Sequence, residues 1–174
     1  DNAFEEIVLA CMDESNGVTA PHMVITLLAR ITDSELRSST FLKIVERAQR
    51  VKSLRDASDA MLRSYVDFAL ELPKATERCV ASARMLAILE DNAGVNAKQM
   101  SEQLLVGIDS AWNALLNEWD KIRMAYELAS LLGDKNLDVA RAYVQKADAC
   151  RQGNGLSEGD GSALFVSALQ LCNI

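Results

Sequence analysis

The sequence has few residues that would break a helix and few that would build a sheet. Only two prolines, Pro21 and Pro73, occur among 174 residues, and aromatic residues make up 5% of the chain. Proline interrupts helices, whereas strands favour β-branched and aromatic residues. Ala, Leu, Met, Glu, Lys, Arg and Gln, which favour helices, are abundant instead. We therefore expect an all-α fold, a single-domain multi-helix bundle in which any sheet has at most two short strands.

Long hydrophobic runs are also absent. No apolar stretch approaches the roughly 20 residues that a membrane-spanning helix needs, and the acidic start is unlike the basic flank of a signal peptide. The apolar fraction of 49% and the charged fraction of 25% are typical of a globular protein. We expect one soluble domain over residues 1–174 that does not insert into a membrane. The compartment stays open, with an intracellular location favoured over secretion.

The sequence lacks the usual metal-binding and redox motifs. Its four cysteines are far apart, without a C-x-x-C pair, and its single histidine cannot form a histidine-rich metal site: Cys11, Cys79, Cys150, Cys172 and His22. Two arrangements of the cysteines are open, four thiols or disulfides such as Cys11–Cys172 with Cys79–Cys150. The size of the core favours thiols, because a domain this large needs no covalent staple. We expect no metal and no cofactor.

Catalytic patterns are missing as well. His22 follows Pro21 near a helix start, where a surface or capping role is favoured over that of a base. The four glycines in 153–161 precede no Lys-Ser or Lys-Thr pair, so they indicate a flexible connector and no phosphate loop. The paired acids lie outside apolar runs and are expected to be solvated. A non-enzymatic role is favoured.

Apolar residues recur at helical spacing through most of the chain. This pattern predicts about six or seven helices. In residues 34–72 it fits either one long bent helix or two helices broken close to Ser53, and Pro73 ends the run. The other expected helices lie near residues 4–11, 21–31, 73–90, 97–132, 137–150 and 164–171.

The strongest helical pattern predicts one long central helix near residues 97–132. Such a helix would be about 54 Å long and would span the domain. Trp112 and Trp119 would then lie one heptad apart on the same face. Packing in the core is the favoured interpretation of the pair, whereas an exposed pair would be a binding hot spot.

Internal repeats are not evident. Residues 125–150 place Gly133-Asp134 between two Ala-rich helices and resemble one tetratricopeptide-type hairpin. The connecting loop is longer than in that consensus, and no second copy recurs along the chain. A repeat solenoid is therefore not expected.

Basic residues are concentrated in one part of an acidic chain. Residues 30–63 carry a net charge of +3, although the whole chain carries −7. Lys43, Arg47 and Arg50 have the spacing of one helix face, and Arg55 follows them. This face could bind an acidic partner helix or a nucleic-acid backbone, but a solvated face balanced by acids such as Glu46 is favoured. The negative net charge makes nucleic-acid binding the less favoured of the two.

These observations predict a protein-interaction domain that acts as a subunit, adaptor or inhibitor. Its partner would be another protein with an acidic or helical surface, bound in a groove between helices or by the basic helix face 43–55. The candidate partner-binding residues are Lys43, Arg47, Arg50, Arg55, Trp112 and Trp119. One alternative is a small-molecule carrier or enzyme with a Met-lined interior, and another is a nucleic-acid-associated helical domain using residues 37–55.

Overall fold

The structure is a computed structural model that describes residues 3, 6, 7, 10, 21–52, 54–92, 94, 96–133 and 135–153. Between residues 21 and 153 the described chain contains seven α-helices and no strand, which confirms the predicted all-α class. They are α2 (Pro21–Leu28), α3 (Ser34–Val51), α4 (Asp59–Leu70), α5 (Ala75–Glu90), α6 (Ala97–Asn113), α7 (Glu118–Leu132) and α8 (Leu137–Gly153). Of the helix predicted near residues 4–11 the structure describes only residues 6, 7 and 10, which are helical. The helix predicted near residues 164–171 and the connector after Gly153 lie outside the described residues.

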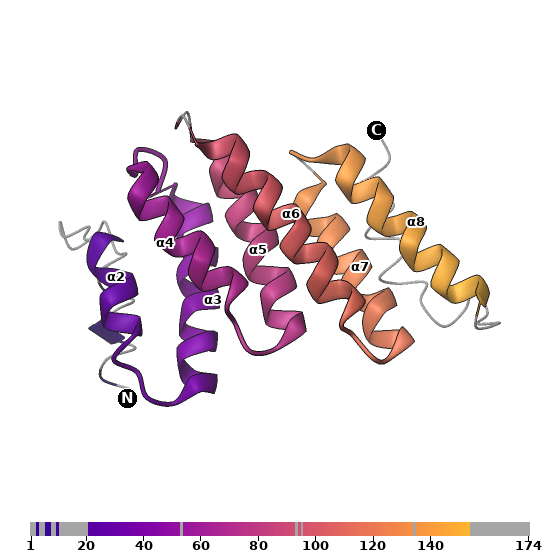
Figure 1. Cartoon of the computed structure of the whole chain (residues 1–174), viewed down its shortest axis with the longest axis horizontal. Coiled ribbons are helices and arrows are strands. Elements are labelled where there is room, and N and C mark those ends of the chain that lie inside the picture. The colour runs from indigo at the N-terminus through magenta and orange to yellow at the C-terminus, as the bar shows by residue number, and fades with distance from the viewer. Residues whose placement is uncertain are drawn as a thin grey trace.

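The helices stack in two layers. Figure 1 shows α4, α6 and α8 in the front layer, with α3, α5 and α7 behind them. The central helix α5 contacts α3, α4, α6 and α7, and α2 packs on α3 and α4. Successive helices are antiparallel, so the members of the front layer all run in one direction. The described helices thus form a multi-helix bundle, as the sequence predicted, with its members arranged in two layers.

Residues 34–72 form two helices, and not the single long bent helix that the sequence also allowed. The Asp33 carboxylate caps the start of α3 by accepting hydrogen bonds from the Glu35 and Leu36 amides at 2.8 and 3.0 Å. Lys52 then takes a left-handed conformation with φ of 55°, which ends α3. The Ser58 hydroxyl caps α4. Helix α3 therefore ends at Val51 and α4 begins at Asp59, which confirms the prediction of two helices broken close to Ser53.

The prediction of one long helix over residues 97–132 is wrong. Helix α6 ends at Asn113 and α7 begins at Glu118, so the predicted 36-residue run is two helices joined by a short turn. The Asn117 side chain caps α7, because its Oδ1 atom accepts a hydrogen bond from the Trp119 amide at 2.9 Å. After the turn, α7 packs on α5 and α8, and α6 packs on α5 and α4. No single helix spans the described domain.

The connections at one end of the layers are tied together by Asp91 and Asn92. The Asp91 carboxylate lies 2.6 Å from the Lys135 ammonium and 3.9 Å from that of Lys52. The Asn92 amide nitrogen donates to the carbonyls of Leu54 and Arg55, at 3.2 and 2.6 Å. These contacts hold together the three connections that follow α3, α5 and α7.

The core runs through both layers and contains three of the six methionines. The Phe41 ring packs on Phe68 and Tyr65, with centroid distances of 4.5 and 6.1 Å. Helix α5 is apolar over most of its circumference, as expected for a helix with four neighbours. The described methionines differ in exposure: Met85, Met100 and Met124 are buried, Met61 is partly buried and Met23 is exposed.

None of the described helices is long and apolar enough to cross a membrane.

Candidate functional site

The basic residues predicted to bind a partner lie on α3 and just beyond it. Lys43, Arg47 and Arg50 are on α3, as their spacing predicted, whereas Arg55 lies in the connection after the helix has ended. The Arg50 guanidinium pairs with Glu46 at 3.1 Å, and Glu46 also lies 3.6 Å from Arg84. The carboxylate between these two arginines reduces the positive potential of the face.

The two tryptophans do not share a face, contrary to the prediction, because they lie on different helices. Trp112 is only 8% exposed, and its indole N–H donates to the Lys121 carbonyl at 3.0 Å. Trp119 is 45% exposed at the start of α7, and the preceding turn exposes 99% of Leu116. Trp112 is therefore a core residue, and Trp119 with Leu116 forms a small exposed apolar patch.

The described cysteine side chains show no reactive centre. Cys79 is a buried free thiol, so the Cys79–Cys150 disulfide considered from the sequence is absent. Its S–H group donates to the Ile108 carbonyl at 3.8 Å, and burial raises the pKa of the thiol to about 12. Such a thiol is protonated and unreactive at neutral pH. Cys11, Cys172 and the His22 side chain lie outside the described atoms.

A cluster of polar and aromatic groups joins α6 to α8. Asp109 on α6 accepts hydrogen bonds from the Tyr143 hydroxyl at 2.7 Å and from the Lys146 ammonium at 2.5 Å. The same ammonium lies 4.4 Å from the Tyr143 ring centroid and 5.3 Å from that of Trp112. These residues are beside a surface depression of about 340 Å³ that Leu105 and Val139 also line.

The electrostatics of this cluster are those of a structural contact. Partial burial raises the pKa of Asp109, but the hydrogen bonds from Lys146 and Tyr143 outweigh that effect and hold the pKa below its usual value. Burial and the bond to Asp109 raise the pKa of Tyr143 far above its usual value. The Asp109 carboxylate accepts hydrogen bonds from the Tyr143 hydroxyl and the Lys146 ammonium, so the polar groups of the cluster are bonded to one another. The cluster therefore joins α6 to α8 and is best explained as a structural contact.

A wider groove lies between α4 and α6 in the front layer. Its volume is about 570 Å³, and its lining consists of Asp67, Leu70, Gln99, Glu102, Gln103, Val106, Gly107 and Ser110. We call it the α4/α6 groove. A Cβ atom at Gly107 would clash with the Leu70 side chain, so glycine permits the close approach of the two helices. This contact forms an apolar base for the groove.

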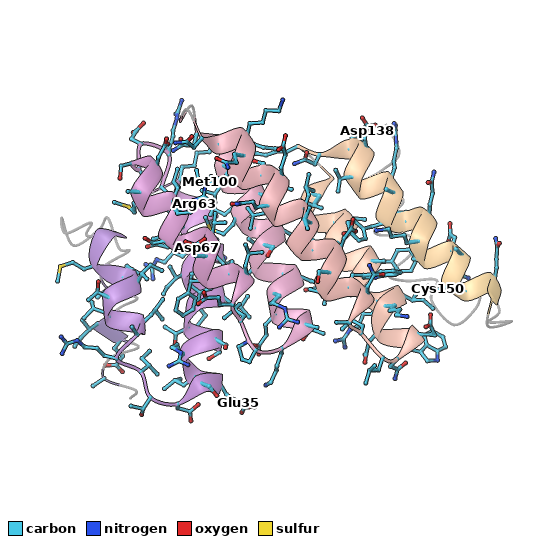
Figure 2. The ribbon with its side chains drawn as sticks, in the orientation of Figure 1. Glu35, Arg63, Asp67, Met100, Asp138 and Cys150 are labelled. Carbon is cyan, nitrogen blue, oxygen red and sulfur yellow. The ribbon has the colours of Figure 1, made fainter. Side chains whose placement is uncertain are left out.

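The groove exposes both apolar and charged groups. Val106 is 71% exposed, an unusual position for valine in the middle of a helix. The Arg63 guanidinium donates to the Gln103 side chain across the two helices, and Figure 2 shows Arg63 and Asp67 on α4 beside α6. Among the described residues, neither Asp67 nor Glu102 has a hydrogen-bond or ion-pair partner for its carboxylate.

Sequence reasoning named a helical groove as a possible site but none of the residues in this one. Two signals were available, a glycine inside a predicted helix and a valine opposite the apolar stripe of that helix. Neither signal identifies α4 as the second wall. The described residues contain no group of three His, Cys, Asp or Glu side chains that could hold a metal ion.

No family model matches the chain, and neither the curated proteins nor the solved structures include a significant match.

Proposed function

We propose that this chain is a non-enzymatic protein-interaction domain that binds its partner in the α4/α6 groove. The observation that carries the proposal is the 71% exposure of Val106 in the middle of a groove about 570 Å³ in volume. An exposed apolar side chain has no stabilising contact in the isolated domain, and it becomes favourable when a partner removes it from water.

The groove also suits a macromolecule better than a small metabolite. It is an open trough between two helices, and small-molecule sites are usually concave enough to bury most of their ligand. The alternative of a Met-lined interior site has less support, because Met85, Met100 and Met124 are buried in the packed core. No methionine lines either the α4/α6 groove or the α6/α8 depression.

Two other surfaces compete with the groove for the same function. One is the basic face of α3, where Glu46 already pairs with Arg50. The other is the patch of Leu116 and Trp119, which is confined to one turn and the start of one helix. The walls of the groove come from two helices, α4 and α6, which gives a partner two sets of side chains to recognise.

The proposal is tested by placing a charge on each surface in turn. Tagged wild type, Val106→Lys, Leu116→Glu and the Arg47→Glu/Arg50→Glu double variant are isolated from the cells in which the protein occurs. Circular dichroism and thermal unfolding establish that each variant is folded. We expect wild type to bind a partner in a stoichiometric complex, and we expect only Val106→Lys to lose that partner. Retention of the partner by Val106→Lys would refute the groove as the binding surface.

A further inference from the structure

The charge on the α4/α6 groove indicates which kind of partner it binds. Its lining contains two carboxylates, Asp67 on α4 and Glu102 on α6, and no lysine or arginine. Neither carboxylate has an ion-pair partner among the described residues, unlike Glu46 and Asp91. Other surface acids such as Glu71 are also unpaired, but Asp67 and Glu102 differ from them in lining a groove with an apolar base. A positively charged ligand would therefore find both walls available.

The cation that bonds to the groove lining does not pair with either carboxylate. Arg63, one turn before Asp67 on α4, directs its guanidinium to the neutral Gln103 side chain. In the neighbouring depression both acids have a cationic partner: Lys146 is bound to Asp109, and the fully exposed carboxylate of Asp138 at the start of α8 lies 3.9 Å from Arg141. The unpaired carboxylates are therefore those of the α4/α6 groove, and not those of the depression beside α8.

The shape of the groove matches a helix. Gln99, Gln103, Val106 and Ser110 line it from one side at spacings of four, three and four residues, which is one row along α6. Eleven residues of helix rise about 16 Å, so the row is long enough for about three turns of a partner helix. The described residues offer no sheet edge to which an extended peptide could add, whereas a helix satisfies its own backbone.

We infer that the α4/α6 groove binds a basic amphipathic helix of a partner protein. The apolar stripe of that helix packs on Val106, Leu70 and Gly107, and its lysines or arginines pair with Asp67 and Glu102. The inference rests on the proposed function, since it names the partner's chemistry for the same groove. Apolar contact supplies attraction, and the two carboxylates select the sign of the charge.

The test uses two synthetic peptides of defined composition. Each is an amphipathic helix of sixteen residues with a Leu/Ala stripe, one flanked by lysines and the other by glutamates at the same positions. They are titrated into the ¹⁵N-labelled full chain, and backbone amide shifts are followed. We expect the lysine peptide to shift the amides of Val106, Gly107 and Leu70 saturably, and the glutamate peptide to leave them in place.

Matched charge changes test the role of the two carboxylates. The double variant Asp67→Lys/Glu102→Lys should weaken binding of the lysine peptide more than tenfold, because two attractive charge pairs become repulsive. Asp67→Asn/Glu102→Gln should weaken it several-fold, because exposed ion pairs contribute modestly. The control Asp120→Lys/Glu127→Lys changes the net charge equally on α7 and should leave binding unchanged.

Three results would overturn the inference. The first is equal binding of both peptides, and the second is the absence of groove shifts with either peptide at millimolar concentration. The third is shifts that appear with rising protein concentration alone, which would mean that a second copy occupies the groove. If Val106→Lys still removed the natural partner after the first or the second result, the proposed function would stand and the partner would not be a basic helix.

Discussion

Replacing Asp109 with alanine should destabilise the protein substantially, although the residue is on the surface. Its carboxylate is the acceptor for the Tyr143 hydroxyl, and Tyr143 is only 3% exposed. Removing the acceptor leaves a largely buried hydroxyl without its partner, which costs about 1–3 kcal/mol. The half-exposed ion pair with Lys146 adds about 0.2–1 kcal/mol.

The expected total is about 2–3 kcal/mol. For a chain of this length each kcal/mol lowers the melting temperature by about 2–4 °C, so Asp109→Ala should melt roughly 5–10 °C below wild type. The assay is urea unfolding at pH 7, followed by circular dichroism. The control is Asp138→Ala, which removes a fully exposed carboxylate from the same depression. It should change the free energy of unfolding by less than about 0.5 kcal/mol.

The loss should also depend on pH in a defined direction. The pKa of Asp109 in the folded protein lies below the ordinary value of 3.8, so the folded state binds fewer protons than the unfolded state in acid. The carboxylate therefore stabilises the fold fully above the ordinary pKa, and the contribution is lost as pH falls through the folded pKa. The difference between wild type and Asp109→Ala should shrink below about pH 3.8 accordingly.

A double-mutant cycle with Tyr143→Phe separates the hydroxyl contact from other effects. Tyr143→Phe should destabilise wild type and should have little effect in the Asp109→Ala background, because the hydrogen bond is then already absent. A loss below 0.5 kcal/mol for Asp109→Ala at pH 7, or additive effects of the two substitutions, would refute the view that this cluster clamps α6 to α8.

Three further substitutions or modifications test other local contacts. Asn92→Ala should lower the free energy of unfolding in urea by about 1–3 kcal/mol, because the Asn92 side-chain amide donates to three carbonyls of the α3–α4 connection. The exposed Asn113→Ala should be neutral, and equal effects of the two substitutions would contradict this reasoning. Cys79 should resist iodoacetamide at pH 8 in the native protein and react once it is unfolded, as read by peptide mass mapping, and rapid native labelling would show the burial to be wrong. Lys52→Gly should raise stability by about 0.5–1 kcal/mol, because glycine adopts the positive φ more readily, and a loss of stability would contradict that reason.

Much of the helical content could be predicted from local patterns. Pro21 in a first turn and Pro73 after a helix gave the bounds of α2 and α4 closely, and apolar periodicity located α3, α5 and α8. The stacking of these helices in two layers could not be predicted, because it depends on contacts between residues far apart in the chain and no repeat signals it.

The break between α6 and α7 shows where periodicity misleads. The turn at 114–117 is close to one helical turn in length, so Ile108, Ala111, Leu115 and Ile122 keep an apolar phase across it. No glycine or proline marks the turn. The available signal was Asn117 followed by acidic residues, which is the pattern of a helix start.

Only one wall of the α4/α6 groove could be predicted from the sequence. Val106 lies two residues from both Leu104 and Ile108, which places it about 200° around the helix from the buried stripe. Its exposure therefore follows once the stripe is known. That α4 supplies the other wall depends on the tertiary contact of Leu70 with Gly107, for which the sequence contains no pairing signal.

Site-specific photo-crosslinking tests the central claim most directly. A photoreactive residue is placed at position 106 and, separately, at positions 116 and 47, and the crosslinked peptides are sequenced after irradiation in the native cells. The account predicts one protein crosslinked from position 106, through a segment that carries several lysines or arginines at helical spacing. A partner crosslinked from position 116 or 47 and absent from position 106 would contradict it.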